Sequence, residues 1–166
     1  MQGPYRDFLV ERFGFREWSS AESKTVISGV RLDTTELRGL RQVRVDRVSV
    51  PGARAAYQGM WESANNPETL VRVDVIELPT VNSAREMVLS LLGEFQAPTL
   101  RRSELPLGDI SFATPDTTSV IFARQNVAAM LRNAGREVIP VGDFARDLDN
   151  VLLRWKAEPQ EFTRNP

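Results

Sequence analysis

The sequence contains no histidine and no cysteine among its 166 residues. The absence of histidine excludes Ser-His-Asp and Cys-His catalysis and removes the usual general base at neutral pH. The absence of cysteine excludes disulfides, thiolate nucleophiles and thiolate zinc sites. Chemistry based on carboxylates, lysine, tyrosine or serine is left.

Lysine is scarce as well, since every basic residue except Lys24 and Lys156 is arginine. The net charge is −1, so the chain has no strong field to steer nucleic acid or anionic lipid. No apolar run approaches the roughly 20 residues that cross a bilayer, and the first residues do not resemble a signal peptide. We expect a cytoplasmic protein, or an extracytoplasmic one if a leader has been removed.

Glycine-rich phosphate loops are missing, because Gly39 and Gly52 are isolated. The carboxylate groupings that remain are Asp74 with Glu77, and Asp143 with Asp147 and Asp149. The first two are three apart on an expected strand and so point to opposite faces. We expect the others to cap or line the solvent side of a helix. The sequence therefore predicts no catalytic residue, no metal ligand and no cofactor.

The chain is predicted to form a single domain over 1–166, with 42% apolar and 26% charged residues. Two ranges, 43–95 and 109–156, each show three short strand patterns followed by an amphipathic helix. A short helix and an irregular lead occupy 1–40, and 157–166 is expected to be a frayed tail. The order of elements suggests a two-fold β-β-β-α duplication.

Local patterns locate the elements. The run 42–50 alternates and then changes phase at Arg47, which predicts a β-bulge there. Strands are expected over 53–62, 70–78, 109–113, 118–124 and 127–132, with a tight turn at Gln125-Asn126. The first long helix should start at a capping box on Ser83 and the second near Asp143. Together these indicate an α+β fold with an antiparallel sheet of about six strands packed against two amphipathic helices.

The most distinctive surface candidates are arginines at every third residue: Arg38, Arg41, Arg44 and Arg47, with Arg31 and Arg54 nearby. Acidic residues interrupt this stretch and aromatic platforms are missing from it, which does not favour nucleic acid. Trp61 ends an expected strand beside a polar loop. The candidate interaction residues are therefore Trp61, Arg41, Arg44 and Arg47.

These observations favour a noncatalytic bacterial domain that binds a protein partner or a small ligand through its sheet or strand-turn edges. Two alternatives stay open. The first is a carboxylate-dependent hydrolase, which requires two acids brought together by the fold. The second is an anion or nucleic-acid binder that uses Arg38 to Arg54.

Overall fold

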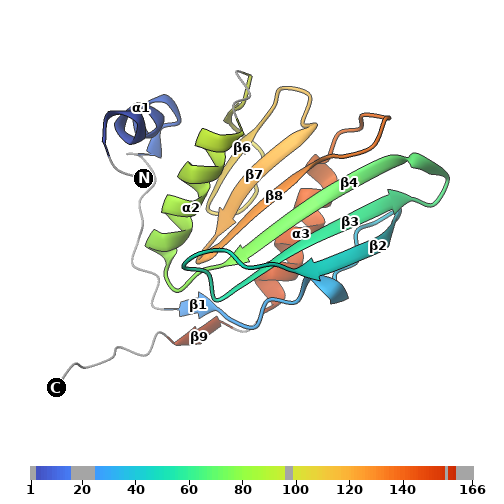
Figure 1. Cartoon of the computed structure of the whole chain (residues 1–166), viewed down its shortest axis with the longest axis horizontal. Helices are drawn as coiled ribbons and strands as arrows, with labels where there is room; N and C mark the ends of the chain where they lie inside the picture. The colour runs from blue at the N-terminus through green and yellow to red at the C-terminus, as the bar shows by residue number, and fades with distance from the viewer. Residues whose placement is uncertain (1–2, 16–24, 96–98, 156, 160–166) are drawn as a thin grey trace.

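The computed structural model describes residues 3–15, 25–95, 99–155 and 157–159. The elements follow one another along the chain (Figure 1) in the order α1 (Pro4–Arg12), β1 (Thr25–Ile27), the 3-10 helix η2 (Leu32–Thr34), β2 (Leu40–Arg47), β3 (Ala55–Ser63), β4 (Asn66–Glu77), α2 (Val81–Glu94), β5 (Arg101–Arg102), β6 (Ile110–Ala113), β7 (Ser119–Arg124), β8 (Val127–Asn133), α3 (Gly142–Arg154) and β9 (Ala157–Pro159).

One antiparallel sheet of seven strands, in the order β2-β3-β4-β8-β7-β6-β5, forms the centre of the fold. The predicted α+β class is confirmed. The sheet has one strand more than expected, because Arg101 and Arg102, which lie between the two predicted ranges, pair with β6. Strands from both predicted ranges, 43–95 and 109–156, share this sheet.

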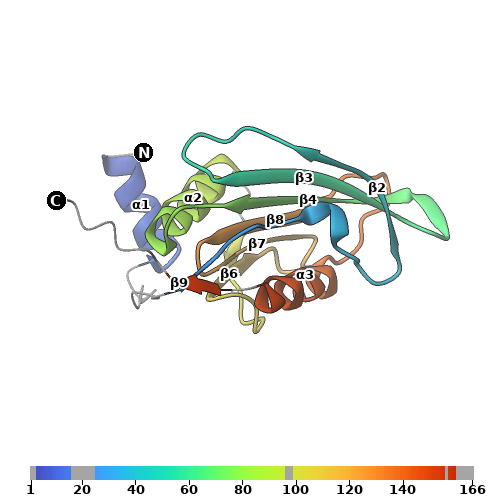
Figure 2. The same ribbon diagram turned by 90° about the horizontal axis from the view of Figure 1, so that it is seen from below.

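Helices cover both faces of the sheet (Figure 2). Along β7, Ile121 and Ala123 face the cluster that contains α2, whereas Val120 and Phe122 face the cluster that contains α3. Successive strand residues point to opposite faces, so the two helices lie on opposite sides. In a duplicated unit, the two antiparallel halves of the sheet would be related by a two-fold axis perpendicular to the sheet. Such a rotation would place both helices on the same side. The duplication is therefore unsupported by the arrangement of the helices.

Two buried polar side chains attach the segment before β2 to the sheet. Asn126 is 0% exposed, accepts from Ile27 N at 2.6 Å, and donates to Ile27 O at 2.9 Å and Leu78 O at 2.7 Å. Glu77, which is 4% exposed, accepts from Val30 N at 2.9 Å. These bonds hold the segment against the α3 side, where β1 pairs with β9. Residues 157–159 are thus a strand rather than a frayed tail, and 160–166 lie outside the described residues.

Several local predictions differ from the structure. The irregularity in β2 falls between Gln42 and Arg44 rather than at Arg47, and it leaves Val43 53% exposed. Helix α2 begins earlier than expected, because the Thr80 hydroxyl accepts from Ser83 N and acts as the N-cap. The predicted tight turn between β7 and β8 is present, and Gln125 has a positive φ of 50° there.

Asn126→Ala should destabilise the fold strongly. The substitution removes three hydrogen bonds and leaves buried backbone groups of Ile27 and Leu78 without partners. We expect a loss of about 3 kcal/mol in the free energy of unfolding, measured by urea denaturation. Asn150→Ala, at an exposed position of α3, is the control and should change stability by less than about 0.5 kcal/mol. A loss below about 1 kcal/mol at Asn126 would contradict this role.

Candidate binding site on the open face of the sheet

Helix α2 covers only part of its side of the sheet. It packs against β7 and β8, and the neighbouring strands β2, β3 and β4 extend beyond it (Figure 1). On the opposite face, Val71, Val73 and Val75 of β4 are 0% exposed beneath the cluster that contains α3. The uncovered area, here called the open face, carries side chains from β2, β3, β4 and β8: Arg44, Asp46, Gln58, Met60, Arg72, Asp74, Met130 and Arg132.

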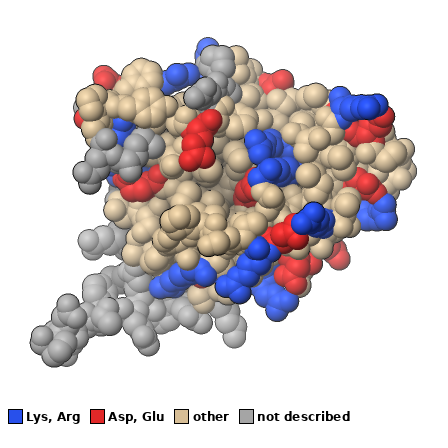
Figure 3. Space-filling model, viewed as in Figure 1, with Lys and Arg blue, Asp and Glu red and all other residues tan. Residues whose placement is uncertain are grey.

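Most of these side chains are half-buried, although the sheet is open to solvent there. Figure 3 views the molecule from this side and shows basic and acidic side chains next to one another among uncharged atoms. A charge on such a surface loses part of its hydration and depends more strongly on its neighbours than an exposed charge does.

Asp74 is the central carboxylate of the open face. Its side chain is 15% exposed and accepts from Arg72 Nε at 3.0 Å and from Arg72 Nη2 at 3.0 Å. Gln58, directly opposite on β3, donates its amide to Asp74 Oδ1 at 3.0 Å. Arg72 and Asp74 are two apart on β4 and therefore share a face. The strand geometry itself orients this bidentate pair.

Burial raises the pKa of the Asp74 carboxyl above its ordinary value, because desolvation penalises the ionised form. The Arg72 charge and its hydrogen bonds oppose this rise, and the charge of Arg132 also lowers the pKa of Asp74. Desolvation is the largest of these effects, so the pKa stays raised overall. The ionised form of Asp74 is thus less favourable in the folded protein than in water.

Arg132 is the least satisfied cation of the open face. It lies on β8 directly opposite Arg72 on one side and opposite Ser119 of β7 on the other. Within the described residues, its side chain makes no hydrogen bond or ion pair, although the residue is half-buried. Two guanidinium groups thus face one tightly held carboxylate, Asp74, and one positive charge is left in excess.

Of the arginines singled out from the sequence, Arg41, Arg44 and Arg47 lie on the edge strand β2, and of these only Arg44 is among the side chains of the open face. Arg41 pairs with Glu62 across the strands, and Arg44 Nε lies 2.5 Å from Asp46 Oδ2. Arg38 pairs with Asp147 at 2.8 Å. The acidic partners neutralise most of the stripe. Charged side chains and a bulge on an edge strand also prevent pairing with another chain, which is a structural role for these residues.

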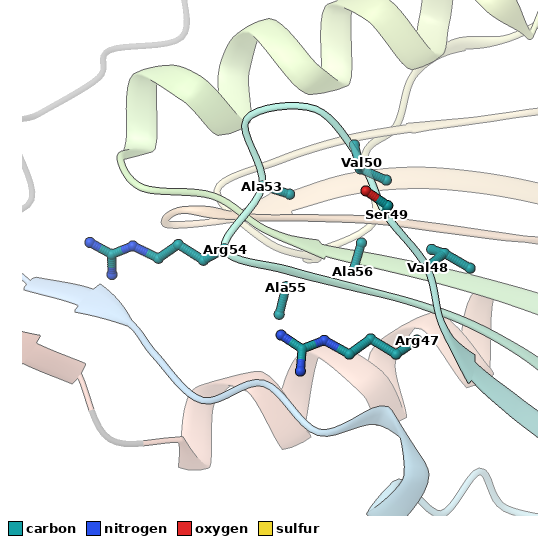
Figure 4. Close-up of a pocket in the computed structure, with 8 residues that line it drawn as sticks. All are labelled: Arg47, Val48, Ser49, Val50, Ala53, Arg54, Ala55 and Ala56. Atoms are coloured by element: carbon teal, nitrogen blue, oxygen red, sulfur yellow. The ribbon is translucent and has the colours of Figure 1, made fainter.

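Arg47 and Arg54 flank a hollow of about 390 Å³ at the loop between β2 and β3 (Figure 4). Both extend from the loop to the same side. Neither makes an ion pair or a side-chain hydrogen bond within the part of the chain that the structure describes. The remaining lining is small and mostly apolar: Val48, Ser49, Val50, Ala53, Ala55 and Ala56. The two guanidinium groups are therefore the polar feature of this hollow.

Trp61, the other candidate from the sequence, is only 1% exposed and belongs to the core on the α3 side. Its ring packs over Gly59, where an added Cβ would lie 2.3 Å from the ring atom Cζ3. The glycine is therefore required by the tryptophan. Burial leaves the indole little surface for a partner.

The acidic groupings do not converge on a site. Asp74 lies on the open face and Glu77 on the α3 side, as the alternation predicted. Asp143 lies in the first turn of α3 without capping it, since the N-cap is Val141. Asp149 is buried, contrary to expectation, and its carboxylate lies 2.7 Å from Arg124 Nη2. Among the described residues, no group of three or more acids could hold a metal ion.

Comparison with family models, curated proteins and solved structures found no match for this chain. None of the helices in the described part of the chain has the length and apolar character needed to cross a membrane. The function is therefore inferred from the open face and its side chains.

Sequence reasoning did not identify the open face. One signal was present: Arg72 and Asp74 alternate with the valines of β4 and so had to share a face. Arg132 gave no such signal, because its position beside Arg72 depends on the pairing of strands that lie 60 residues apart in sequence.

Arg132→Gln should raise the pKa of Asp74 further, because it removes a charge that favours the carboxylate. The pKa can be measured by ¹³C NMR titration of the Asp74 side chain. Arg136→Gln is the control, since Arg136 is 86% exposed and pairs with Glu68 instead. An Asp74 pKa that is equal in Arg132→Gln and wild type would show that the two charges do not interact.

The raised pKa of Asp74 also determines how the stability of the fold changes with pH. Because the folded pKa of Asp74 is above the unfolded one, protonated Asp74 favours the folded state. This contribution is present below the unfolded pKa and is lost as pH rises through the folded pKa. Asp74→Asn should remove that part of the pH dependence of unfolding, measured by urea denaturation across the acidic range.

Proposed function

We propose that this protein is a noncatalytic binding domain that takes a small ligand or a protein partner on the open face of its sheet. The observation that carries the proposal is the half-buried polar cluster of Arg72, Asp74 and Arg132, which α2 leaves uncovered and in which one cation has no ion-pair partner among the described residues. Partly desolvated polar groups on a rigid sheet are preorganised for binding, because little order has to be gained when a ligand arrives.

The support comes from the sheet rather than from its edges. The strands that carry the cluster are central, and a packed core under their other face holds them in register. The edge arginines Arg41 and Arg44 already have acidic partners. Binding through the open face thus uses side chains with fixed positions, whereas an edge would first have to break ion pairs.

The two alternatives have less support. An anion or nucleic-acid surface over Arg38 to Arg54 would have to use Arg47 and Arg54, since Arg38, Arg41 and Arg44 are neutralised. For a carboxylate-dependent hydrolase, the pair of acids joined by the fold is Asp109 and Asp149. Both pair with Arg124, so the two carboxylates already share one cation.

An NMR fragment screen tests the proposal. The ¹⁵N-labelled protein is titrated with neutral, anionic and cationic small molecules, and saturable shifts should cluster at backbone amides of β3, β4 and β8. Met60→Trp should abolish these shifts, because Met60 lies directly opposite Arg72 and a larger ring there fills the open face. The matched control is Leu153→Trp at a position of α3 that is 58% exposed. Shifts that cluster elsewhere, or that persist in Met60→Trp, would contradict the proposal.

A further inference from the structure

We infer that Arg132, together with the Nη1 group of Arg72, binds the carboxylate group of a small acid with an apolar body. This inference rests on the proposed use of the open face and names the class of ligand. Like charges on directly opposite residues of neighbouring strands repel each other, and Arg72 and Arg132 are such a pair. A bound anion would remove this repulsion.

The unused hydrogen-bond donors define where the anion would lie. Arg72 directs Nε and Nη2 at Asp74, which leaves its Nη1 group available. The guanidinium of Arg132 makes no hydrogen bond within the described ranges. A guanidinium presents parallel N–H donors that match the two oxygens of a carboxylate. The anion is therefore expected beside Arg132, on the side of Arg72 that Asp74 does not occupy.

Charge selects a carboxylate rather than a phosphate. Asp74 is held by Arg72 and Gln58, and its negative charge repels an incoming anion. The cluster thus has a single excess positive charge, which one monoanion neutralises. A phosphate dianion would leave a surplus negative charge next to Asp74 on a half-buried surface, at a larger electrostatic cost.

Met60 supplies most of the apolar part of the site, and Met130 lies where the site borders the core under α2. Met60 lies directly opposite Arg72, and Met130 lies directly opposite Asp74. Both side chains project from the same face as the arginines, but Met60 is half-buried, whereas Met130 is 8% exposed and packs in the core cluster that contains α2. Thioether side chains adapt to irregular apolar shapes and contact aromatic rings favourably. An acid such as benzoate, with a ring attached to its carboxylate, satisfies both the arginines and the methionines.

The test compares four probes at constant ionic strength: benzoate, its neutral isostere benzamide, acetate and inorganic phosphate. Binding is followed through the arginine Nε–Hε signals and the amides of β4 and β8. We expect saturable binding of benzoate that shifts the Arg132 signal, weaker binding of acetate, and no binding of benzamide. Tighter binding of phosphate than of benzoate would overturn the choice of a monocarboxylate.

Two variants remove the site in different ways. Arg132→Gln deletes the cation, and Ser119→Asp places a carboxylate directly opposite Arg132, where it replaces the ligand's charge. Each should weaken benzoate binding by about tenfold or more. Arg136→Gln is the control and should bind as the wild type does.

The outcomes separate the inference from the proposed function. If benzamide and benzoate bind the open face equally, or if Arg132→Gln binds benzoate as the wild type does, the carboxylate site is wrong while the open face still binds ligands. If no probe and no fragment perturbs the open face, both the inference and the proposed function fail.

Discussion

Antiparallel pairing between β4 and β8 determines most of what the molecule presents to solvent. These strands join the two groups of sequence-adjacent strands into one sheet, with Val73 opposite Leu131 and Asp74 opposite Met130. Since directly opposite residues share a face, this register sends the valines of β4 into the core and Arg72 towards Arg132. A slip of one residue would exchange the two faces and bury the charges beneath α3. The core and the candidate site thus depend on the same register.

The open face combines two opposing requirements. Its charges stand on central strands, where neighbouring side chains exclude part of the water, and burial raises the pKa of Asp74 accordingly. Arg72 and Gln58 compensate Asp74 with directed hydrogen bonds, while Arg132 receives no comparable partner from the described residues. The protein tolerates this imbalance because the opposite face supplies a large apolar core. Uncompensated polarity of this kind is common where a ligand completes the site.

Local patterns in the sequence predicted the elements well where one residue's environment depends on near neighbours. The alternating valines of β4, the apolar stripe of α2 and the turn at Gln125 and Asn126 are of this type. Predictions were wrong where a segment far away in the sequence determines whether a residue is buried or paired. Asp149 looked solvent-facing because its partner Arg124 lies on β7, and β9 looked frayed because its partner β1 is more than 100 residues away in sequence.

The environments of the sheet's arginines also depend on segments far apart in the sequence, and they differ between the edges and the centre of the sheet. Those of β2 stand on an edge strand, where a long side chain can reach both solvent and an acidic neighbour, as Arg41 and Arg44 do. Arg101 and Arg102 form the short strand at the opposite edge. Arg72 and Arg132 stand in the middle, where flanking strands limit their movement. Composition does not distinguish these residues, whereas strand pairing places Arg72 and Arg132 next to each other on central strands and the other arginines at the edges.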